Sequence, residues 1–507
     1  MHTMRTGFDN DKYLNEQSEA ILKRAARLGD KLYLEFGGKL LFDMHAARVL
    51  PGFDPNVKMR LLQKLKDRID IVLCIFAGDI ERKKLRADFG ITYDVDALKL
   101  IDDLGKWGLG VAGVVVTRYD DQPSARQFIR RLDNQGIRTY THRAIKGYPA
   151  DVERIISDEG YGANDYIETT KPIVVVNGPG PGSGKMATCL SQVYHGFQRG
   201  EPCGYAKFET FPIWNLPLKH PVNMAYEAAT CDIADFNLID PHHLEAHGET
   251  AINYNRDVEA FPLVKRILRE IMGSADCYQS PTDMGVNRAG FAITDDEVVG
   301  EAANQEIIRR YFRYHCEYAM GFATRGTVDR IEMILEGMDI RQERRAVVNP
   351  ARKAAEDAHN LAEKGHDGVF CGAAIELSNG EIVTGRNSPL MHAGSSATLN
   401  AAKTLAGIPH EIPLLSDSVV ESVANMKRDL LESRSASLSL DEALIALAIS
   451  AAQNPSARLA LDKISELRNC EMHITHMPTP GDEAGLRQLG VNLTSEPNFA
   501  SRDLFIT

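Results

Sequence analysis

Residues 174–190 read VVVNGPGPGSGKMATCL, and this segment decides the fold that we predict for the chain around it. An apolar run typical of a buried strand leads into a turn with four glycines, and a helical pattern follows. Glycines let a backbone wrap closely around an anion, and the N-terminus of a helix presents free N–H groups with a partial positive charge. The order of strand, glycine-rich turn and helix therefore predicts a phosphate site, in which Lys185 is the cation.

Strands and helices alternate on the N-terminal side of this segment. Apolar strands are predicted at residues 69–77, 111–118 and 172–177 and from Ile137 onward, and amphipathic helices are predicted near residues 95–107, 124–134 and 152. Such an alternation is typical of a mostly parallel sheet with helices on both faces. We therefore predict an α/β fold with a P-loop-like sheet for this part of the chain.

A β-hairpin is predicted before these elements, at residues 31–44. Two apolar-rich runs, KLYLEF and KLLFDM, flank Gly37-Gly38, a pair that can take positive φ at both turn positions. Alternation along the second run would place Lys39, Asp43 and His45 on one face, either as a group for acid–base chemistry or as a solvated sheet face. A helix is predicted to follow, with Asp54 as N-cap and Pro55 at its first position.

Length and composition limit the class of protein. A chain of 507 residues exceeds one hydrophobic core, so two to four domains are expected. The net charge of −12 argues against a nucleic-acid partner, and no apolar run is long enough for a membrane span or resembles a signal peptide. Eight cysteines without a CxxC pair indicate reduced thiols and a cytoplasmic location. A symmetric homo-oligomer is the common state of such proteins.

We divide the chain into three parts. Residues 1–300 form the α/β domain with the glycine-rich loop, residues 301–350 form a helical connector, and residues 351–507 form a second α/β domain. In the second domain two strands join at Ser378-Asn379-Gly380, a helix follows from His392, and a strand starts at Cys470. A helical insertion is predicted at about residues 411–468, and the helical pattern breaks near Asn349-Pro350.

The loop departs from the Walker A pattern GxxxxGK[ST] at informative positions. Pro179 stands where the first glycine is expected, and Met186 stands where a hydroxyl would bind Mg²⁺. Thr188 lies about 200° further round the helix, so it is no simple replacement. The missing hydroxyl argues against metal-assisted hydrolysis at the loop. The core PGSGK at residues 181–185 resembles the loop of adenylate-kinase-like P-loop enzymes, and the alternative is a glycine-rich turn that only packs a helix on a sheet.

The predicted ligand contacts come from the loop itself. Main-chain N–H groups and one ammonium would hold a phosphorylated small molecule through the following residues: Gly178, Gly180, Gly182, Ser183, Gly184 and Lys185. The Mg²⁺ that accompanies a nucleoside phosphate would need a carboxylate, and Asp240 follows a short apolar run as a Walker B carboxylate does. Asp240 equally fits the N-cap of a helix, because Pro241 would then occupy the first helical position.

Two further groups carry candidate chemistry. His243 and His247 are four residues apart, so both imidazoles would project from one face of a helix as metal-binding pairs do, with Asp240 as a third candidate ligand. The segment SPTDMGVNR at residues 280–288 is polar and rich in turn residues. Asp283 and Arg288 can therefore line a pocket and contact substrate, or belong to a plain loop.

The C-terminal region resembles the cytidine-deaminase fold. The segments GAAIELSNGEIVTGRNS and HAGSSATLNAAKTLA are similar to the hairpin and the zinc-binding helix of that family. The helix begins His392-Ala393-Gly394, so the proton-shuttling Glu of the family is replaced by glycine. The later segment, MPTPGDE at residues 477–483, contains no cysteine. One of three usual ligands remains, which argues against deaminase-type zinc chemistry while leaving the fold resemblance.

Nearly the whole chain resembles the bacterial family catalogued as domain of unknown function 1846. The stretches EFGGKLLFDMHAARVLPGFDP, NGPGPGSGKMATCLSQ and SPTDMGVNRAG carry this resemblance. The family implies no activity, so the function has to be argued from the site.

Three hypotheses follow from the sequence. The first is an enzyme that binds a nucleotide or another phosphorylated metabolite and transfers a phosphoryl group, with Lys185, Asp240, Asp283 and Arg288 as its catalytic residues. The second is a non-catalytic sensor or assembly protein that binds a phosphorylated ligand. The third is a metal-dependent hydrolase that uses His243 and His247.

Overall fold

The computed structural model describes residues 5–29, 31–86, 90–361, 363–433 and 435–501, which form two compact units. The N-terminal unit contains Arg5–Thr230 and Asp235–Ala303, and the C-terminal unit contains Cys231–Ala234 and the chain from Asn304 onward. Helix α13 (Asp296–Ala319) begins in the first unit and ends in the second. In the described residues, no helix combines the length and the apolar character that crossing a bilayer requires.

A six-stranded parallel sheet forms the centre of the N-terminal unit. Its strand order is β6-β5-β2-β7-β1-β8, and every neighbouring pair is parallel. The strands are β1 (Leu32–Phe36), β2 (Ile69–Phe76), β5 (Val111–Thr117), β6 (Thr139–His142), β7 (Ile173–Asn177) and β8 (Gly204–Phe208). All five residues of β7 are buried, as expected for a strand covered on both faces. The predicted parallel α/β sheet is therefore confirmed.

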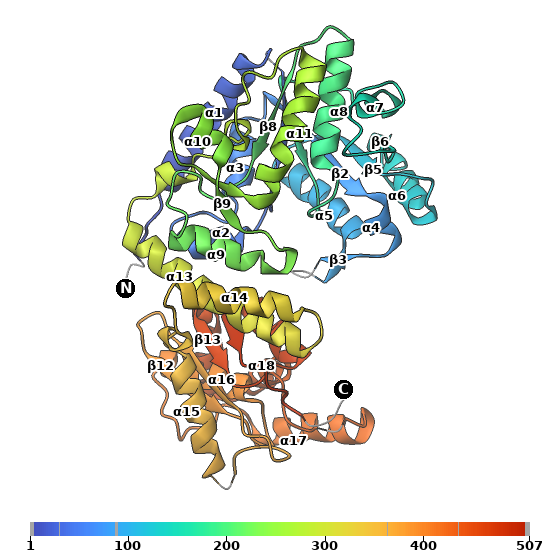
Figure 1. Cartoon of the computed structure of the whole chain (residues 1–507). Helices are drawn as coiled ribbons and strands as arrows, with labels where there is room; N and C mark the ends of the chain where they lie inside the picture. Colours follow the sequence, from blue (N-terminus) through green and yellow to red (C-terminus); the bar gives the residue numbers. More distant parts are fainter. Residues whose placement is uncertain (1–4, 30, 87–89, 362, 434, 502–507) are drawn as a thin grey trace. The chain divides into compact units, whose positions relative to one another are not determined.

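Helices flank this sheet (Figure 1). Helix α8 (Lys185–Gln198) packs on β1, β7 and β8, and α11 (Asn255–Met272) packs on α8. The other helices are α1 (Asn10–Arg27), α2 (Met44–Val49), α3 (Val57–Lys64), α4 (Ala77–Glu81), α5 (Tyr93–Lys106), α6 (Pro123–Asp133), α7 (Val152–Ile155), α9 (Pro221–Ala229), α10 (Pro241–His247) and α12 (Pro281–Met284). Two small antiparallel sheets pair β3 (Leu85–Arg86) with β4 (Ile91–Thr92) and β9 (Asn237–Ile239) with β10 (Ile252–Tyr254).

The hairpin predicted at residues 31–44 is wrong. Its first arm is β1, which lies between β7 and β8 and pairs in parallel with both. Both edges of β1 are occupied, so a second arm has nowhere to pair. Asp43 caps α2 by accepting from the N–H of Ala46, and it forms an ion pair of 2.8 Å with the buried Lys58. Lys39, Asp43 and His45 therefore do not share the face of a strand.

Two helix boundaries also differ from those predicted. Helix α3 begins at Val57, and Asp54 instead accepts from the N–H of Asn56 and pairs with Arg60. In the C-terminal unit the helical pattern does not break at Pro350, because this residue lies in the first turn of α15 (Val348–His359). An N–H in the first helical turn has no partner within the helix, so proline is tolerated there.

The C-terminal unit is built on a mixed four-stranded sheet with the order β12-β11-β13-β14. The predicted hairpin is confirmed as β11 (Gly372–Glu376) and β12 (Ile382–Arg386), and β13 (Glu471–Ile474) pairs with β11 in antiparallel fashion and with β14 (Asn492–Ser495) in parallel. The helices are α14 (Arg325–Gly337), α15, α16 (Ala393–Ala406), α17 (Asp417–Asn425), α18 (Leu440–Ser450), α19 (Pro455–Lys463) and α20 (Pro480–Leu489). Residues 411–468 are largely helical, as predicted.

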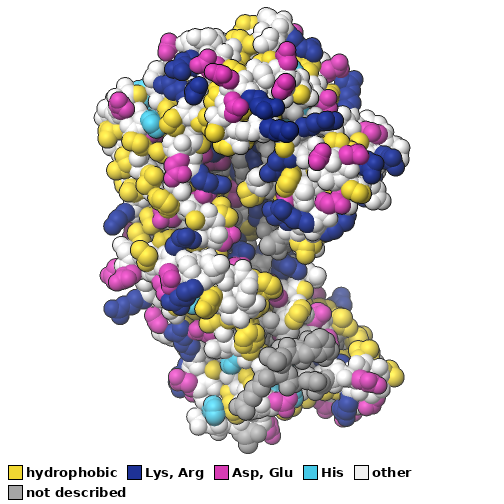
Figure 2. Space-filling view, turned by 45° about the vertical axis from the view of Figure 1, so that its right-hand side comes forward, with side chains coloured by type: hydrophobic (Ala, Val, Ile, Leu, Met, Phe, Trp, Pro, Cys, Tyr) yellow, Lys and Arg dark blue, Asp and Glu magenta, His cyan; other side chains and the backbone are white. Residues whose placement is uncertain are grey.

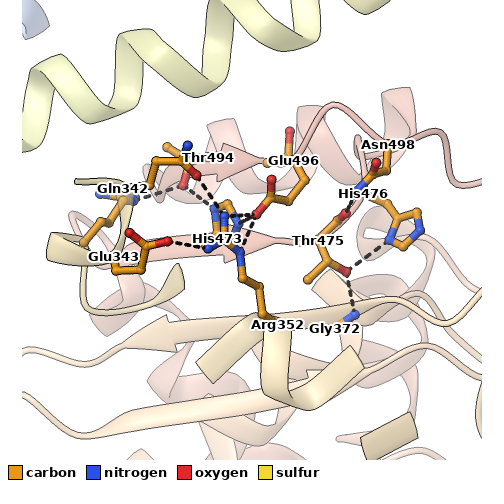
Figure 3. Close-up of polar contacts among 12 residues, drawn as sticks. Gln342, Glu343, Arg352, Gly372, His473, Thr475, His476, Thr494, Glu496 and Asn498 are labelled. Atoms are coloured by element: carbon orange, nitrogen blue, oxygen red, sulfur yellow. Dashed lines mark hydrogen bonds and ion pairs between the residues drawn. The ribbon is translucent and has the colours of Figure 1, made fainter. Parts of the chain in front are cut away.

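A polar network joins β13, β14 and α15 in this unit (Figure 3). The ring of His473 is fully buried, and its two nitrogens lie 2.9 Å from Thr494 Oγ1 and 3.3 Å from Glu496 Oε1. Arg352 donates to Glu496 and to Glu343, each at 2.8 Å. Burial lowers the pKa of His473 and favours the neutral ring. The network therefore ties the edge of the sheet to the start of α15.

A buried histidine in the N-terminal unit makes stability depend on pH. His142 ends β6, where its Nε2 donates to the carbonyl of Asp165 (3.1 Å) and its Nδ1 lies 3.4 Å from Thr188 Oγ1. Burial lowers the pKa of His142 to about 4. The unfolded chain takes up this proton near pH 6.5, whereas the folded unit resists it, so stability falls as the pH drops from 6.5 towards 4.

His142 should make the wild type lose about 2 kcal/mol of stability between pH 7.5 and 5.0. We predict that this part of the loss is absent in His142→Gln. Glutamine can both donate and accept, so the two hydrogen bonds are preserved in kind. Urea denaturation followed by tryptophan fluorescence measures this, since Trp107 and Trp214 both lie in the N-terminal unit. The control is His410→Gln at an exposed position, and equal pH dependence in both variants contradicts the assignment.

Candidate functional site

The glycine-rich loop joins the carboxyl end of β7 to the start of α8. Gly182 and Gly184 have φ values of +74° and +94°, which residues with a side chain rarely adopt, and they turn the chain into the helix. Gly184 is the N-cap of α8, and no side chain caps this helix. The first turn of α8 therefore keeps its free N–H groups.

These main-chain N–H groups have no partners among the described residues. Those of residues 183–187 donate no hydrogen bond there, and the first regular bond of the helix runs from the N–H of Thr188 to the carbonyl of Gly184, at 2.9 Å. Pro181 and Gly182 at the tip of the loop are exposed, so solvent reaches the turn. This is the condition that an anion cradle at a helix N-terminus requires.

Lys185 supplies a positive charge at the same place. Its Nζ lies 3.4 Å from the carbonyl of Gly180 and 3.5 Å from the hydroxyl of Ser183. Within the described residues no carboxylate forms an ion pair with this ammonium. The ammonium of Lys185 therefore contacts only neutral oxygen atoms. A bound anion would neutralise its positive charge.

A second cation reaches the loop from the neighbouring part of the sheet. Thr117 ends β5 and donates to the carbonyl of Ser183 (2.7 Å), and Arg118 donates to the carbonyl of Gly182. The guanidinium of Arg118 lies 3.5 Å from the ring centroid of Phe76. Arg118 was not predicted as a site residue, although its position at the end of a predicted apolar strand was a usable signal.

Asp240 follows β9, which lies in a different sheet from β7, the strand before the loop. Its strand, β9, pairs only with β10 among the described strands, and a Walker B carboxylate needs a strand of the main sheet. One carboxylate oxygen accepts from the N–H groups of His242 and His243 at 3.0 and 3.1 Å, and the other accepts from the hydroxyl of Thr282 at 2.8 Å. These bonds support the alternative reading of Asp240, a helix N-cap with Pro241 at the first position of α10.

The structure brings His243, His247 and Asp283 together. His247 Nε2 lies 3.0 Å from the carboxylate of Asp283, and His243 Nδ1 lies 3.9 Å from it. The hydrogen bond to Asp283 raises the pKa of His247. The two histidines do share one face of α10, as their spacing predicted, while the neighbouring carboxylate is Asp283 and not Asp240.

A cavity of about 280 Å³ lies beside β8 in the N-terminal unit, and three of the predicted residues line it: His243, Asp283 and Arg288. None of its lining residues belongs to the glycine-rich loop in the described chain, so the predicted residues fall into two places. Four charged residues that also line the cavity were not predicted from the sequence: Arg24, Lys207, Glu209 and Asp257. Strand β8, which carries Lys207 and ends before Glu209, was not predicted, while Arg24 and Asp257 come from helices α1 and α11, far away in the sequence.

The charges inside the cavity are mostly paired. Lys207 Nζ lies 2.6 Å from Asp257 and 3.2 Å from Glu209. Burial raises the pKa of Glu209 to about 7, against the opposing effect of Lys207. A carboxylate with this pKa can accept and release a proton near neutral pH. Glu209 is therefore harder to ionise than an exposed glutamate, although it lies beside Lys207.

Known proteins and family models match nearly the whole length of the chain. The family models described as DUF1846, N-terminal, and DUF1846, C-terminal, match residues 6–339 and 343–505. A UPF0371 protein of Clostridium tetani is 53% identical over 502 residues, and one of Clostridium botulinum is 54% identical over 503 residues. A UPF0371 protein of Fusobacterium nucleatum is 54% identical over 504 residues. In each case 99% of both chains is covered, and none of these descriptions mentions a deaminase.

We predict that Gly184→Ala lowers the free energy of unfolding by about 1–3 kcal/mol more than Gly182→Ala does. Both residues have positive φ, so both variants carry the cost of a left-handed alanine. A Cβ at Gly184 would meet Thr117 at 2.8 Å, and this side chain is anchored on Ser183, whereas a Cβ at Gly182 meets nothing within 4 Å. Urea denaturation compares the two variants, and equal losses would show that the loop relaxes away from β5.

Proposed function

We propose that this chain, which belongs to the DUF1846 family, binds a nucleotide or another phosphorylated small molecule at residues 178–185. One observation carries the proposal. The N–H groups of residues 183–187 have no hydrogen-bond acceptor among the described residues, and the ammonium of Lys185 beside them has no carboxylate partner there. A phosphate group satisfies both deficits at once, because it offers several acceptor oxygens and a negative charge.

The attraction for an anion has to be local. The chain carries a net charge of −12, and basic and acidic side chains are intermixed on the face drawn in Figure 2. At the loop, the partial positive charge of the α8 N-terminus adds to Lys185 and Arg118, which both contact loop oxygens. Local dipoles and cations of this kind bind small anions against an unfavourable overall charge.

Phosphoryl transfer is the enzymatic form of this proposal, and its metal chemistry differs from that of a Walker A site. Met186 offers no hydroxyl, and the hydroxyl of Thr188 is buried between His142 Nδ1 and the thiol of Cys74, each at 3.4 Å. A Mg²⁺ ion would therefore arrive with the nucleotide and take its remaining ligands from water or carboxylates.

A non-catalytic sensor or assembly protein is the alternative that shares the same site. In the C-terminal unit, where the deaminase resemblance would place zinc, His392 N-caps α16 and its Nδ1 lies 2.7 Å from the carboxylate of Asp482. This contact uses the one zinc ligand that the resemblance retains. The C-terminal unit would then serve recognition or assembly instead of catalysis.

We predict that a panel of nucleotides and sugar phosphates, with and without Mg²⁺, contains a compound that raises the melting temperature of the wild type. A ligand at 100 times its Kd stabilises the native state by about 2.7 kcal/mol. Lys185→Ala should abolish most of the shift, whereas Lys171→Ala should keep it, because Lys171 precedes the same strand at its opposite end. A shift that survives in Lys185→Ala, or a panel without any shift, contradicts the proposed site.

Turnover separates the enzyme from the sensor. The phosphotransferase hypothesis predicts that each protein molecule consumes many molecules of nucleoside triphosphate in the presence of an acceptor, and that Lys185→Ala stops this. The sensor hypothesis predicts saturable binding with no product formed. Measurement of the nucleoside diphosphate released per protein molecule decides between them.

A further inference from the structure

A second set of chemically reactive side chains lies on α10 and α12, apart from the glycine-rich loop. One ligand atom each of His243, His247 and Asp283 can be chosen so that all three lie within 4.8 Å of one another. The two imidazole centroids are 4.5 Å apart on adjacent turns of α10. Two histidines and one carboxylate form the ligand set of many catalytic zinc sites, in which the fourth position is left for water or substrate.

We infer that these three side chains form a binding site for one divalent cation of the zinc class. Ligand atoms at about 2.0–2.1 Å from a tetrahedral zinc lie roughly 3.4 Å apart. Measured from Oδ1 of Asp283, the separations bracket this value, at 3.2 Å for His247 Nε2 and 3.9 Å for His243 Nδ1. The ligand atoms of the two histidines lie within 4.8 Å of each other, so binding of a cation would draw the side chains together.

The backbone around the site is held in place without a cation. Asp240 accepts from the first N–H groups of α10 with one oxygen and from Thr282 of α12 with the other, so it joins the two helices. Ser280 caps α12, and its hydroxyl lies 2.9 Å from His243 Nδ1, so a cation bound at this nitrogen would displace that hydrogen bond. Asp283 also accepts from the N–H of Gln279 at 3.1 Å. Such bonds around the ligands preorganise a metal site.

The cavity next to the proposed cation site indicates which groups an open coordination position of the cation would face. His243 and Asp283 both line the cavity of about 280 Å³, together with Arg24 and Arg288. Arg24 donates to the carbonyls of Asp283 and Gly285, and no carboxylate of the described chain forms an ion pair with it. A cation with a water ligand on this side would meet small molecules that carry an anionic group. This arrangement gives the hydrolase hypothesis a concrete site, and it does not rest on the glycine-rich loop.

The test is a titration of the full chain, stripped with a chelator, with Zn²⁺ in a calorimeter and with Co²⁺ followed by visible absorption. We expect one equivalent of either ion to bind and the cobalt spectrum to be of the intense tetrahedral type. His247→Ala and Asp283→Asn should each weaken binding by about 100-fold or more, since even partners of metal ligands are worth 10–100-fold. His247 is exposed, so its removal leaves the fold intact.

His242→Ala is the matched control on the same helix, because this ring lies against Phe261, 4.8 Å between centroids, and not in the cluster. It should bind Zn²⁺ as the wild type does, and so should Lys185→Ala. Less than one equivalent bound to the wild type overturns the site. An unchanged affinity in His247→Ala, or an equal loss in His242→Ala, overturns it as well.

Discussion

The parallel alignment of all six strands is the constraint on which the N-terminal unit depends. Strands that run in one direction end at one edge of their sheet, and α/β sheets bind their ligands at this edge. Thr117 ends β5 and Arg118 follows it, the glycine-rich loop follows β7, and Glu209 follows β8, with β1 between β7 and β8. Groups that are far apart in sequence therefore lie along the carboxyl ends of the strands. The pairing of β1 with both β7 and β8 also leaves no open side on β1 for a further strand.

Charge distinguishes the two candidate sites of this unit. At the loop, Lys185 and Arg118 contact neutral carbonyl and hydroxyl oxygens, so an anion can bind there without displacing a carboxylate. In the cavity, Lys207 is already neutralised by Asp257 and Glu209. Arg24 and His243 also line the cavity and contact neutral oxygen atoms, and His247 lies beside His243 on α10. This difference in charge is why we propose a phosphate for the first site and a metal ion for the second.

The predictions from sequence succeeded where the signal was local. The turn from β7 into α8 and the pairing of His243 with His247 on one helical face depend on residues only a few positions apart. The hairpin at residues 31–44 failed because its two glycines fit a tight turn equally well, and only the neighbouring strands exclude it. The carboxylate next to the histidines was assigned to Asp240, only three residues before His243, but Asp283 reaches them from another helix.

The sequence by itself determined the alternation of elements in the main sheet, the conformation of the glycine-rich loop and the position of Lys185 at the start of a helix. These features follow from hydrophobic period, from the backbone freedom of glycine and from hydrogen bonds between near neighbours. Only the tertiary structure decided the strand order, the partners of each charge and the existence of the cavity. Contacts such as that between Arg24 and Asp283 join residues more than 250 positions apart, and no local pattern specifies which distant group will pack beside another.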